Sequence, residues 1–257
     1  LSGVSTAGRM WTPLDLIRVS AEYLADHGVE NARLDAELLL AHVLRMDRLR
    51  LYLEHERPLV AEELDAYREL IRRRARREPL QLLVGEVQIL DLDFTVRPGV
   101  FIPRPETEVL IETVRGLFAD VAPPAMVVEL GLGTGCVGVS LLKGWPSSRL
   151  VGFEVEEKAA ELSAHNARRH DVGDRLEIRR EDGLQAPWPP CELVVSNPPY
   201  VPASRRGSLA PEVRDHDPAA ALFAGEDGLG VIAPLVERAG RALRPGGRLA
   251  FEHGHDL

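Results

Sequence analysis

Apolar residues recur at helical spacing through the first third of the chain and predict three amphipathic helices. The first begins after Thr12-Pro13, a capping residue followed by a proline that suits the first helical turn, and ends at Gly28. The second covers about residues 34–44 and the third about residues 61–77. The positions expected to face the core are Leu14, Ile17, Ala21, Leu24, Leu34, Leu38, Ala41, Leu64, Tyr67, Leu70 and Ile71. Residues 1–80 are therefore predicted to form a small helical domain that starts with a flexible lead over residues 1–10.

The pattern changes to period two beyond residue 85, which favours strands. Val87 and Ile89 alternate with polar neighbours, as do Leu92 and Phe94, and Asp91 between the two runs indicates a turn. Residues 81–105 are thus predicted to be a linker that holds a two-stranded hairpin and a proline-rich stretch.

Strand and helix patterns alternate from residue 106 onward. The expected helices cover residues 106–118, 135–142, 157–169 and 228–243, and the expected strands cover residues 126–130, 149–153, 176–179, 193–196 and 248–252. Alternation with short connections implies a mostly parallel sheet with helices on both faces. The predicted fold class is therefore α/β, with a Rossmann-like doubly wound sheet in residues 106–257 behind the helical domain and the linking β-hairpin.

Charge and composition narrow the range of partners. The formal net charge of −9 argues against broad contact with phosphates, so no stable nucleic-acid binding is expected. No apolar run approaches the roughly 18 residues that span a bilayer, and no signal-peptide pattern is present. Cys136 and Cys191 are far apart and each lies beside an apolar run, which predicts two buried thiols in a reducing compartment. We expect a cytoplasmic monomer without membrane contact.

The arginine-rich run Arg72–Arg77 has two interpretations. It can be the solvated end of a helix, where cations interact favourably with the helix dipole. It can also be a contact surface for ribosomal RNA or for an acidic partner.

A glycine-rich turn lies between a predicted strand and a predicted helix. Gly131, Gly133 and Gly135 allow a sharp turn and a close approach of a ligand to the backbone. The next strand ends at Glu154, where a carboxylate can accept hydrogen bonds from ribose hydroxyls. The turn alone is a weak signal, but the turn and Glu154 together indicate a nucleoside-containing ligand.

Two such ligands compete, a dinucleotide and S-adenosylmethionine. The spacing of the three glycines differs from the Gly-x-Gly-x-x-Gly of dinucleotide sites. Glu129, just before the turn, would oppose a pyrophosphate but can pair with the amino group of the methionine part of S-adenosylmethionine. Alternatively, Glu129 caps the following helix. Asp182 falls at the rim of the same crevice, where it can accept from an adenine amino group or belong to an ordinary Asp-Gly turn.

The segment Asn197-Pro198-Pro199-Tyr200 follows an apolar strand. Two prolines make a stiff loop at the carboxyl end of a parallel strand, the place where open α/β sheets bind ligands. The side-chain oxygen of Asn197 and the backbone oxygen of Pro198 can each accept from one N–H of a planar amide or amine, and Tyr200 can form a flat wall. This arrangement would position a poorly nucleophilic nitrogen against the donor methyl group, so we expect neither a metal nor a strong general base. A plain turn is the alternative.

Several motifs resemble one family. Phe101-Ile102-Pro103-Arg104-Pro105-Glu106-Thr107-Glu108 is similar to a specific segment of the release factor glutamine methyltransferases, the HemK/PrmC family. Glu78-Pro79-Leu80-Gln81, Asn197-Pro198-Pro199-Tyr200, Pro211-Glu212-Val213 and Gly225-Glu226-Asp227-Gly228 also match, so the resemblance covers nearly the full chain.

The resemblance implies methyl transfer from S-adenosylmethionine to the side-chain amide N5 of the glutamine in the Gly-Gly-Gln motif of class 1 peptide chain release factors, with S-adenosylhomocysteine as product. It implies that the helical domain recognises the release factor and that Glu154 holds the ribose. It also implies that Asp182 lies near adenine and that Asn197, at the junction of donor and substrate, binds the glutamine. The residues expected to line the substrate side are Phe101, Ile102, Pro103, Asn197, Pro198, Pro199 and Tyr200.

The chain departs from the family pattern in three places. Leu132 stands where the family usually has threonine, so one hydroxyl contact is lost, and Glu129 replaces the usual aspartate. The family also continues beyond Leu257 into a helix and two strands, so we expect an open sheet edge.

Three rival functions remain open. One is a ribosomal-protein glutamine methyltransferase with the same chemistry. Another is a DNA adenine-N6 methyltransferase that acts on a flipped base, against which the acidic charge balance counts. The third is a non-catalytic module that binds the ribosome or a release factor, against which the presence of Asn197 and Glu154 counts.

Overall fold

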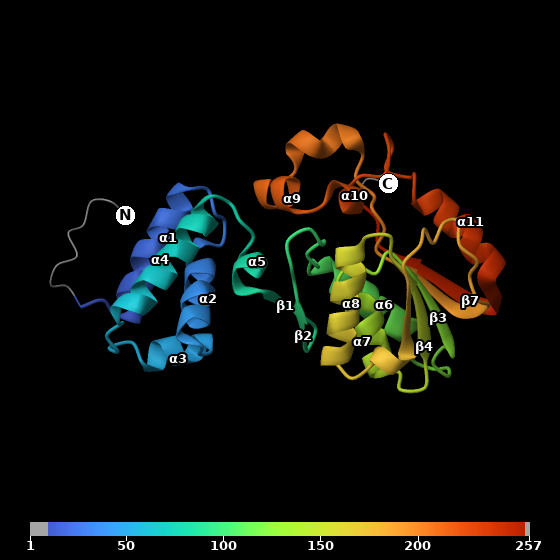
Figure 1. Ribbon diagram of the computed structural model, residues 1–257, viewed down its shortest axis with the longest axis horizontal. Helices are drawn as coiled ribbons and strands as arrows, with labels where there is room; N and C mark the ends of the chain where they lie inside the picture. The colour runs from blue at the N-terminus through green and yellow to red at the C-terminus, as the bar shows by residue number, and fades with distance from the viewer. Residues whose placement is uncertain (1–9, 255–257) are drawn as a thin grey trace. The chain divides into compact units, whose positions relative to one another are not determined.

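The chain divides into two compact units, residues 1–84 and residues 85–257. The computed structural model describes residues 10–254, so residues 1–9 of the predicted flexible lead and residues 255–257 lie outside the described residues. Figure 1 shows the elements of each unit.

The first unit is helical, as predicted. Thr12 caps its first helix by accepting from the backbone N–H of Asp15, and Pro13 occupies the first helical position. The core includes the fully buried side chains of Leu24, Tyr67 and Ile71. The helices are α1 (Pro13–Asp26), α2 (Ala32–Leu44), α3 (Arg48–Leu53), α4 (Ala61–Ala75) and α5 (Leu80–Val84).

Two positions predicted to be buried are exposed, and this part of the prediction was wrong. Leu14 is 37% exposed and Leu34 is 38% exposed. The buried stripe keeps the predicted Ile17 in α1 and adds Leu16, and in α2 it passes through Leu39 and Leu40. Because α2 is apolar around much of its circumference, its sequence period does not by itself specify which face packs inward. The short helices α3 and α5 were not predicted.

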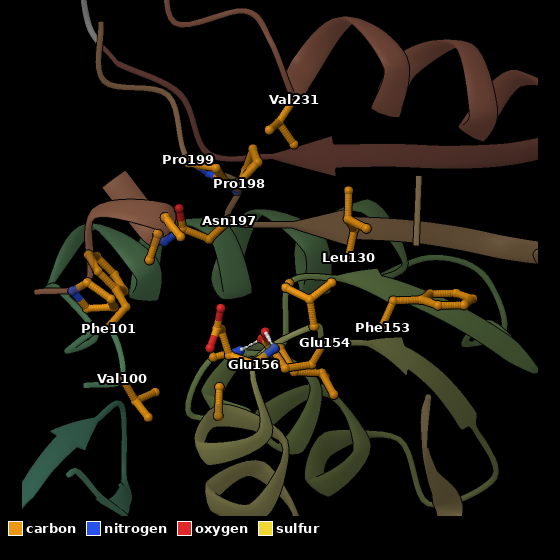
Figure 2. Close-up of a pocket in the computed structure, with 18 of the residues that line it drawn as sticks. Val100, Phe101, Leu130, Phe153, Glu154, Glu156, Asn197, Pro198, Pro199 and Val231 are labelled. Atoms are coloured by element: carbon orange, nitrogen blue, oxygen red, sulfur yellow. Dashed lines mark hydrogen bonds between the residues drawn. The ribbon is translucent and has the colours of Figure 1, made fainter. Parts of the chain in front are cut away.

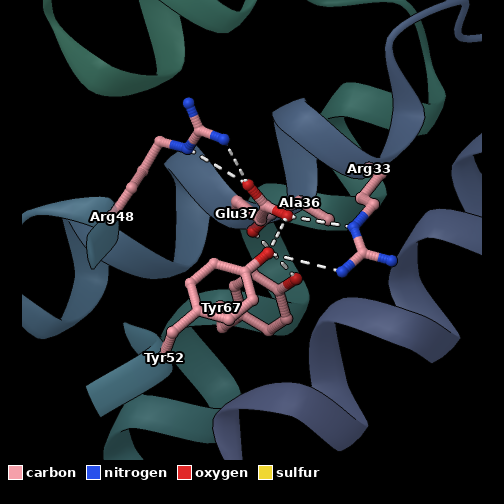
Figure 3. A network of polar contacts seen from close by, with 6 residues as sticks. All are labelled: Arg33, Ala36, Glu37, Arg48, Tyr52 and Tyr67. Atoms are coloured by element: carbon pink, nitrogen blue, oxygen red, sulfur yellow. Dashed lines mark hydrogen bonds and ion pairs between the residues drawn. The ribbon is translucent and has the colours of Figure 1, made fainter. Parts of the chain in front are cut away.

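A buried carboxylate joins α2 to α3. Glu37 accepts from Arg33 at 3.1 Å, from Arg48 at 2.7 Å and from the Tyr52 hydroxyl at 2.5 Å (Figure 3). Only 2% of Glu37 is exposed, so these donors supply the pairing that a buried charge requires.

The arginine run at the end of α4 is bound within its own unit. Arg74 is buried and contacts Asp35 at 2.6 Å. Arg73 contacts Glu78 at 2.5 Å, and Arg77 donates to the carbonyl of Gly28 at 3.0 Å. The run thus includes a buried structural arginine, which neither interpretation of the sequence predicted.

The second unit begins with the predicted hairpin. Strands β1 (Glu86–Ile89) and β2 (Leu92–Thr95) pair antiparallel, with Val87 opposite Phe94. The side chain of Asn166 bonds both the N–H and the carbonyl of Thr95, which fixes the hairpin to the following helical layer.

The centre of the second unit is a five-stranded sheet in the order β5-β4-β3-β6-β7, and all neighbouring strands are parallel. Its strands are β3 (Met126–Leu130), β4 (Arg149–Phe153), β5 (Leu176–Arg179), β6 (Cys191–Ser196) and β7 (Leu243–Phe251). The chain winds outward from β3 to β5 and then returns to the other side of β3 with β6. The carboxyl ends of β3 and β6 therefore flank the topological switch point, where ligands bind in such sheets.

Each face of the sheet is covered by helices. Alternate strand residues such as Val127 and Leu193 pack on one side, and Val128 and Val194 pack on the other. In Figure 1, α6, α7 and α8 lie on one side of β3 and β4, while α11 lies near β7. These helices are α6 (Glu106–Leu117), α7 (Cys136–Gly144), α8 (Glu157–Arg169) and α11 (Ile232–Ala242). This confirms the Rossmann-like doubly wound fold.

Short helical pieces occupy the long connection between β6 and α11, and none of them was predicted. They are η2 (Ala203–Ser208), α9 (Pro211–His216) and α10 (Ala219–Leu222), and a further short turn, η1 (Gly173–Arg175), precedes β5. Cys136 and Cys191 are both free and buried, which confirms the prediction that the two thiols are buried. Across residues 10–254, no helix has both the length and the apolar character needed to cross a membrane.

Candidate active site

A pocket of about 290 Å³ opens at the carboxyl ends of β3, β4 and β6. Figure 2 shows Phe101, Glu154 and Asn197 around it, with Leu130 and Val231 nearby. The predicted site residues that line it are Phe101, Pro103, Glu129, Gly131, Gly133, Glu154, Asp182, Asn197, Pro198, Pro199 and Tyr200. Two others, Ile102 and Gly135, do not line the pocket but belong to the structure around it.

The glycine turn connects β3 to α7 through left-handed backbone. Gly131, Gly133 and Gly135 have φ values of 73°, 54° and 79°, a region that L side chains rarely adopt. A Cβ on Gly135 would also lie 3.2 Å from the Cα of Ser163 in α8. The turn therefore requires glycine for its conformation and, at Gly135, for close packing against α8.

Glu154 follows β4 and is held by two backbone donors. Its Oε2 accepts from the N–H of Gly133 at 2.9 Å, and its Oε1 accepts from the N–H of Glu156 at 3.0 Å. The carboxylate is thereby fixed beside the glycine turn at the pocket wall. Each carboxylate oxygen can accept more than one hydrogen bond, so Glu154 retains capacity for a hydroxyl donor.

Glu129 is buried at the base of the pocket, with 1% of the residue exposed. Its Oε2 has no hydrogen-bond partner among the described residues. This atom occupies space that is open because residue 138 in α7 is glycine: a Cβ on Gly138 would lie 2.3 Å from Oε2. Burial raises the pKa of Glu129 well above its usual range, and the charge of Glu154 raises it further. A cationic group in the pocket would supply the missing partner.

Asp182 follows β5 and is exposed at the pocket rim. Its Oδ1 accepts from the N–H of Leu184 at 2.9 Å, which is the bond of a local turn. The turn uses one side-chain oxygen of a residue that also lines the pocket, so the two interpretations of Asp182 are compatible.

The Asn197–Tyr200 segment leaves β6 at the pocket. Asn197 donates through Nδ2 to Glu252 at 2.8 Å and, more weakly, to Thr107 at 3.4 Å. The Tyr200 hydroxyl donates to the other oxygen of Glu252 at 3.0 Å. Asn197 and Tyr200 are thus held by a carboxylate that follows β7, and Pro198 and Pro199 between them cannot donate backbone bonds.

The Phe101–Glu108 segment forms another wall. Phe101, Pro103 and Thr107 line the pocket, whereas Ile102 is fully buried. The buried Asp217 accepts from the backbone N–H of Ile102 at 3.2 Å and also pairs with Arg104. Asp217 thereby ties this segment to the connection that follows α9.

Leu132 and Cys136 complete the pocket beneath the glycine turn. Leu132 packs so closely over β4 that a Cβ on Gly152 would lie 2.4 Å from its Cδ2. At this position the side chain is an apolar contact with the sheet. Burial raises the pKa of the Cys136 thiol to about 12.

Sequence reasoning missed three residues that hold the pocket walls: Thr107, Asp217 and Glu252. Thr107 lies inside the Phe101–Glu108 segment, whose resemblance to the family implies no role for it. Glu252 could have been found from one signal, an acid directly after the last apolar strand. Nothing in the local sequence identifies Asp217 as the partner of a segment more than a hundred residues earlier.

Comparison with known proteins places the chain in a family. The family model for the PrmC N-terminal domain matches residues 15–85, and the model for the methyltransferase small domain matches residues 91–211. A release factor glutamine methyltransferase of Geobacter sulfurreducens is 42% identical over 247 residues, which cover 95% of this chain and 85% of that protein. This chain belongs to the release factor glutamine methyltransferase family. A second relative with that name, from Mycolicibacterium smegmatis, is 42% identical over 92% of this chain and 83% of its own length.

Among solved structures, TrmN from Thermus thermophilus is similar with 18% identity and a TM-score of 0.43, covering 58% of this chain and 39% of that one. The family assignment makes the chain an enzyme that transfers methyl groups, and it removes the non-catalytic module from the candidates.

Proposed function

We propose that this enzyme transfers a methyl group from S-adenosylmethionine to the side-chain N5 of the glutamine in the Gly-Gly-Gln motif of class 1 peptide chain release factors. The observation that carries the proposal is the state of Asn197. Its nitrogen is engaged by Glu252, and its carbonyl oxygen is the end left for a substrate N–H in a pocket that also holds an unpaired buried acid.

The pocket fits the proposed donor. The unpaired Oε2 of Glu129 suits the ammonium group of the methionine part, and the glycine turn has no Cβ to obstruct it. Glu154 suits the ribose hydroxyls, and Asp182 suits the adenine amino group. When bound, S-adenosylmethionine supplies an electrophilic methyl group on sulfur and leaves as S-adenosylhomocysteine.

The chain's own residues would position the acceptor nitrogen. Asn197 Oδ1 and the carbonyl of Pro198 accept the two N–H groups of the glutamine amide, which prevents rotation and directs the nitrogen toward the methyl carbon. The N–C bond then forms as the S–C bond breaks, and the cationic nitrogen releases a proton to solvent. Tyr200 and Phe101 flank the planar amide. Positioning of this kind supplies most of the expected rate gain.

The remaining features agree with the same proposal. We propose that the helical unit, residues 1–84, recognises the release factor, and that the enzyme acts in the cytoplasm, where release factors work. The names of the relatives support this substrate class.

The test is methyl transfer from labelled donor to a purified class 1 release factor, with mass-spectrometric mapping of the modified residue. A factor with glutamine replaced by alanine in Gly-Gly-Gln, a mixture of ribosomal proteins and an adenine-containing DNA serve as comparison substrates. Modification of the Gly-Gly-Gln glutamine alone is expected. Preferred methylation of a ribosomal protein or of DNA would replace this proposal with the corresponding rival.

Asn197→Ala is expected to lower kcat roughly 10²-fold, because the acceptor nitrogen loses its positioning bond. The dissociation constant of S-adenosylmethionine, measured by calorimetry, should change little. Asn31→Ala is the matched control, since Asn31 is exposed in the helical unit and makes no side-chain capping bond. Unchanged turnover in Asn197→Ala would refute the assigned role.

A further inference from the structure

Glu252 lies next to the Asn197–Tyr200 segment although it follows Asn197 by 55 positions in the sequence. Strand β7 pairs parallel with β6, and Phe251 is the partner of Ser196. The N–H of Glu252 continues this ladder by donating to the carbonyl of Ser196 at 3.1 Å. The sheet therefore fixes the backbone of Glu252 beside that of Asn197, at the edge of the pocket.

The carboxylate of Glu252 gathers donors from two other segments. Oε2 accepts from Asn197 Nδ2 at 2.8 Å and from the Thr107 hydroxyl at 3.4 Å, and Oε1 accepts from the Tyr200 hydroxyl at 3.0 Å. The first of these bonds is the shortest. A single side chain thus joins β7, the start of α6 and both ends of the Asn-Pro-Pro-Tyr segment.

This contact decides which end of the Asn197 amide faces the substrate. An asparagine side chain carries a donor at one end and an acceptor at the other, and the two ends have nearly the same shape. An ionised carboxylate can only accept, so Glu252 attracts the nitrogen end. The oxygen end is then turned away from Glu252 and can accept from an amide N–H. The opposite orientation would present an NH₂ group to the substrate NH₂ group, and no bond could form.

We propose that Glu252 is a positioning residue for methyl transfer, and that its carboxylate sets the Asn197 amide with the oxygen toward the substrate while it fixes the Tyr200 hydroxyl. The proposal rests on the function proposed above. Glu252 acts through its two neighbours and does not itself line the pocket.

The ionisation state of Glu252 provides a further readout. Burial raises the pKa of Glu252, and the charge of Glu106 in α6 raises it further, whereas the bonds from Tyr200, Thr107 and Asn197 lower it. The Cys136 thiol of α7 also faces this charge. A protonated Glu252 can donate to the oxygen of Asn197 and stabilise the wrong orientation. Turnover should therefore fall as the pH is lowered through this raised pKa.

The kinetic test compares Glu252→Ala, Glu252→Gln and Asn197→Ala on the release factor. Glu252→Ala should lower kcat by about tenfold or more through lost positioning, with little change in the affinity for S-adenosylmethionine. Glu252→Gln should recover much of that loss, because its oxygen can still accept from Asn197, and it should lack the fall at low pH. The double variant Asn197→Ala/Glu252→Ala should be no slower than Asn197→Ala alone, since one residue acts through the other.

The pH profiles are measured at saturating S-adenosylmethionine, so that protonation of Glu129 does not lower the occupancy of the donor. Fully additive losses in the double variant, or a Glu252→Gln profile that keeps the fall at low pH, would overturn the proposal. If Glu252→Ala does not fold, the pH profile of turnover in Glu252→Gln alone decides whether Glu252 positions Asn197.

A spectroscopic test separates this proposal from the proposed function. The side-chain NH₂ resonances of Asn197 can be assigned in a ¹H–¹⁵N spectrum by their loss in Asn197→Ala. They should move in Glu252→Ala and stay near their original positions in Glu252→Gln. Unmoved resonances in Glu252→Ala would overturn the role of Glu252 even if the enzyme methylates release factors. If the Asn197 resonances move in Glu252→Ala but the wild-type protein methylates no glutamine, the proposed function alone is refuted.

Discussion

At the scale of single residues, the pocket is defined by carboxylates in different states of pairing. Glu154 accepts two backbone N–H bonds, whereas one oxygen of Glu129 has no partner among the described residues. The two residues lie at the carboxyl-terminal ends of adjacent strands. The backbone N–H of Gly138 compensates Glu129 in part, but its buried Oε2 has no partner among the described residues. A fold retains such a group at a cost in stability, which indicates that its partner arrives with a ligand.

Replacing Glu129 by glutamine should therefore have opposite effects on the two quantities: it should weaken the binding of S-adenosylmethionine and increase the stability of the donor-free protein. Loss of the charged partner should weaken S-adenosylmethionine binding roughly tenfold to a hundredfold, the range for a hydrogen bond between charged groups. The donor-free protein should become more stable at neutral pH. Because the folded pKa of Glu129 lies above the unfolded value of 4.5, folding of the wild type loses stability as the pH rises from 4.5 toward that folded pKa.

The measurement is Tm from pH 5 to 8 for both proteins, together with calorimetric titration of the donor. The difference in Tm in favour of Glu129→Gln should grow with pH in the donor-free proteins. Equal donor affinity in the two proteins would contradict the pairing of Glu129 with the ammonium group.

At the scale of elements, the segment around Phe101–Pro103 is shaped by a distant carboxylate. Asp217, which follows α9, accepts from the N–H of Ile102 and pairs with Arg104. Burial raises the pKa of Asp217, and the charge of Arg104 opposes that increase. The wall of the pocket that would face the substrate is thus held from the connection between β6 and α11.

Asp217→Ala should lower the free energy of unfolding of the second unit by about 1–3 kcal/mol, because the buried N–H of Ile102 loses its acceptor. It should also raise KM for the release factor more than it raises the dissociation constant of S-adenosylmethionine. Asp217→Asn is the matched variant, since its amide oxygen can still accept from Ile102, and its effect on stability should be smaller. Denaturant titration and steady-state kinetics measure both quantities, and a larger loss in Asp217→Asn would contradict this account.

The sequence patterns predicted elements best where burial is complete. Strands β3, β4 and β5 have the predicted bounds. For β3 and β4 the reason is burial on both faces of a parallel sheet, which gives short apolar runs, whereas the edge strand β5 was recognised from alternating apolar and polar residues. Helices α9 and α10 were missed because each is too short to show a period. The glycine turn and Asn197 were recognisable from local sequence, whereas Glu252 reaches Asn197 only through the pairing of β6 with β7.

At the scale of the whole molecule, the two units have separate hydrophobic cores. The core of the first unit contains buried residues from Trp11 to Leu83, and none of these belongs to the cores built around the sheet. The pocket is formed entirely by residues of the second unit. A ligand of the pocket therefore interacts directly with one core only.

Calorimetric unfolding is expected to show this division. S-adenosylmethionine at a hundred times its dissociation constant should stabilise the second unit by about 2.7 kcal/mol, which corresponds to a rise of roughly 5–10 °C in its midpoint. The transition of the first unit should not move. Asp35→Ala should identify that transition by lowering its midpoint, because it removes the buried ion pair between Asp35 and Arg74. A single transition that shifts as a whole with donor would contradict independent unfolding of the units.

The buried thiol at the pocket has a consequence for an enzyme that handles an alkylating agent. Cys136 lines the cavity in which the reactive methyl group is expected to lie, and sulfur is a better nucleophile than an amide nitrogen. Only the thiolate attacks, and burial raises the pKa of Cys136 to about 12, so the thiol stays protonated at neutral pH. If S-adenosylmethionine binds as proposed, burial would thereby protect Cys136 from methylation, and a substitution that admits water or a cation beside the thiol should lead the enzyme to methylate itself.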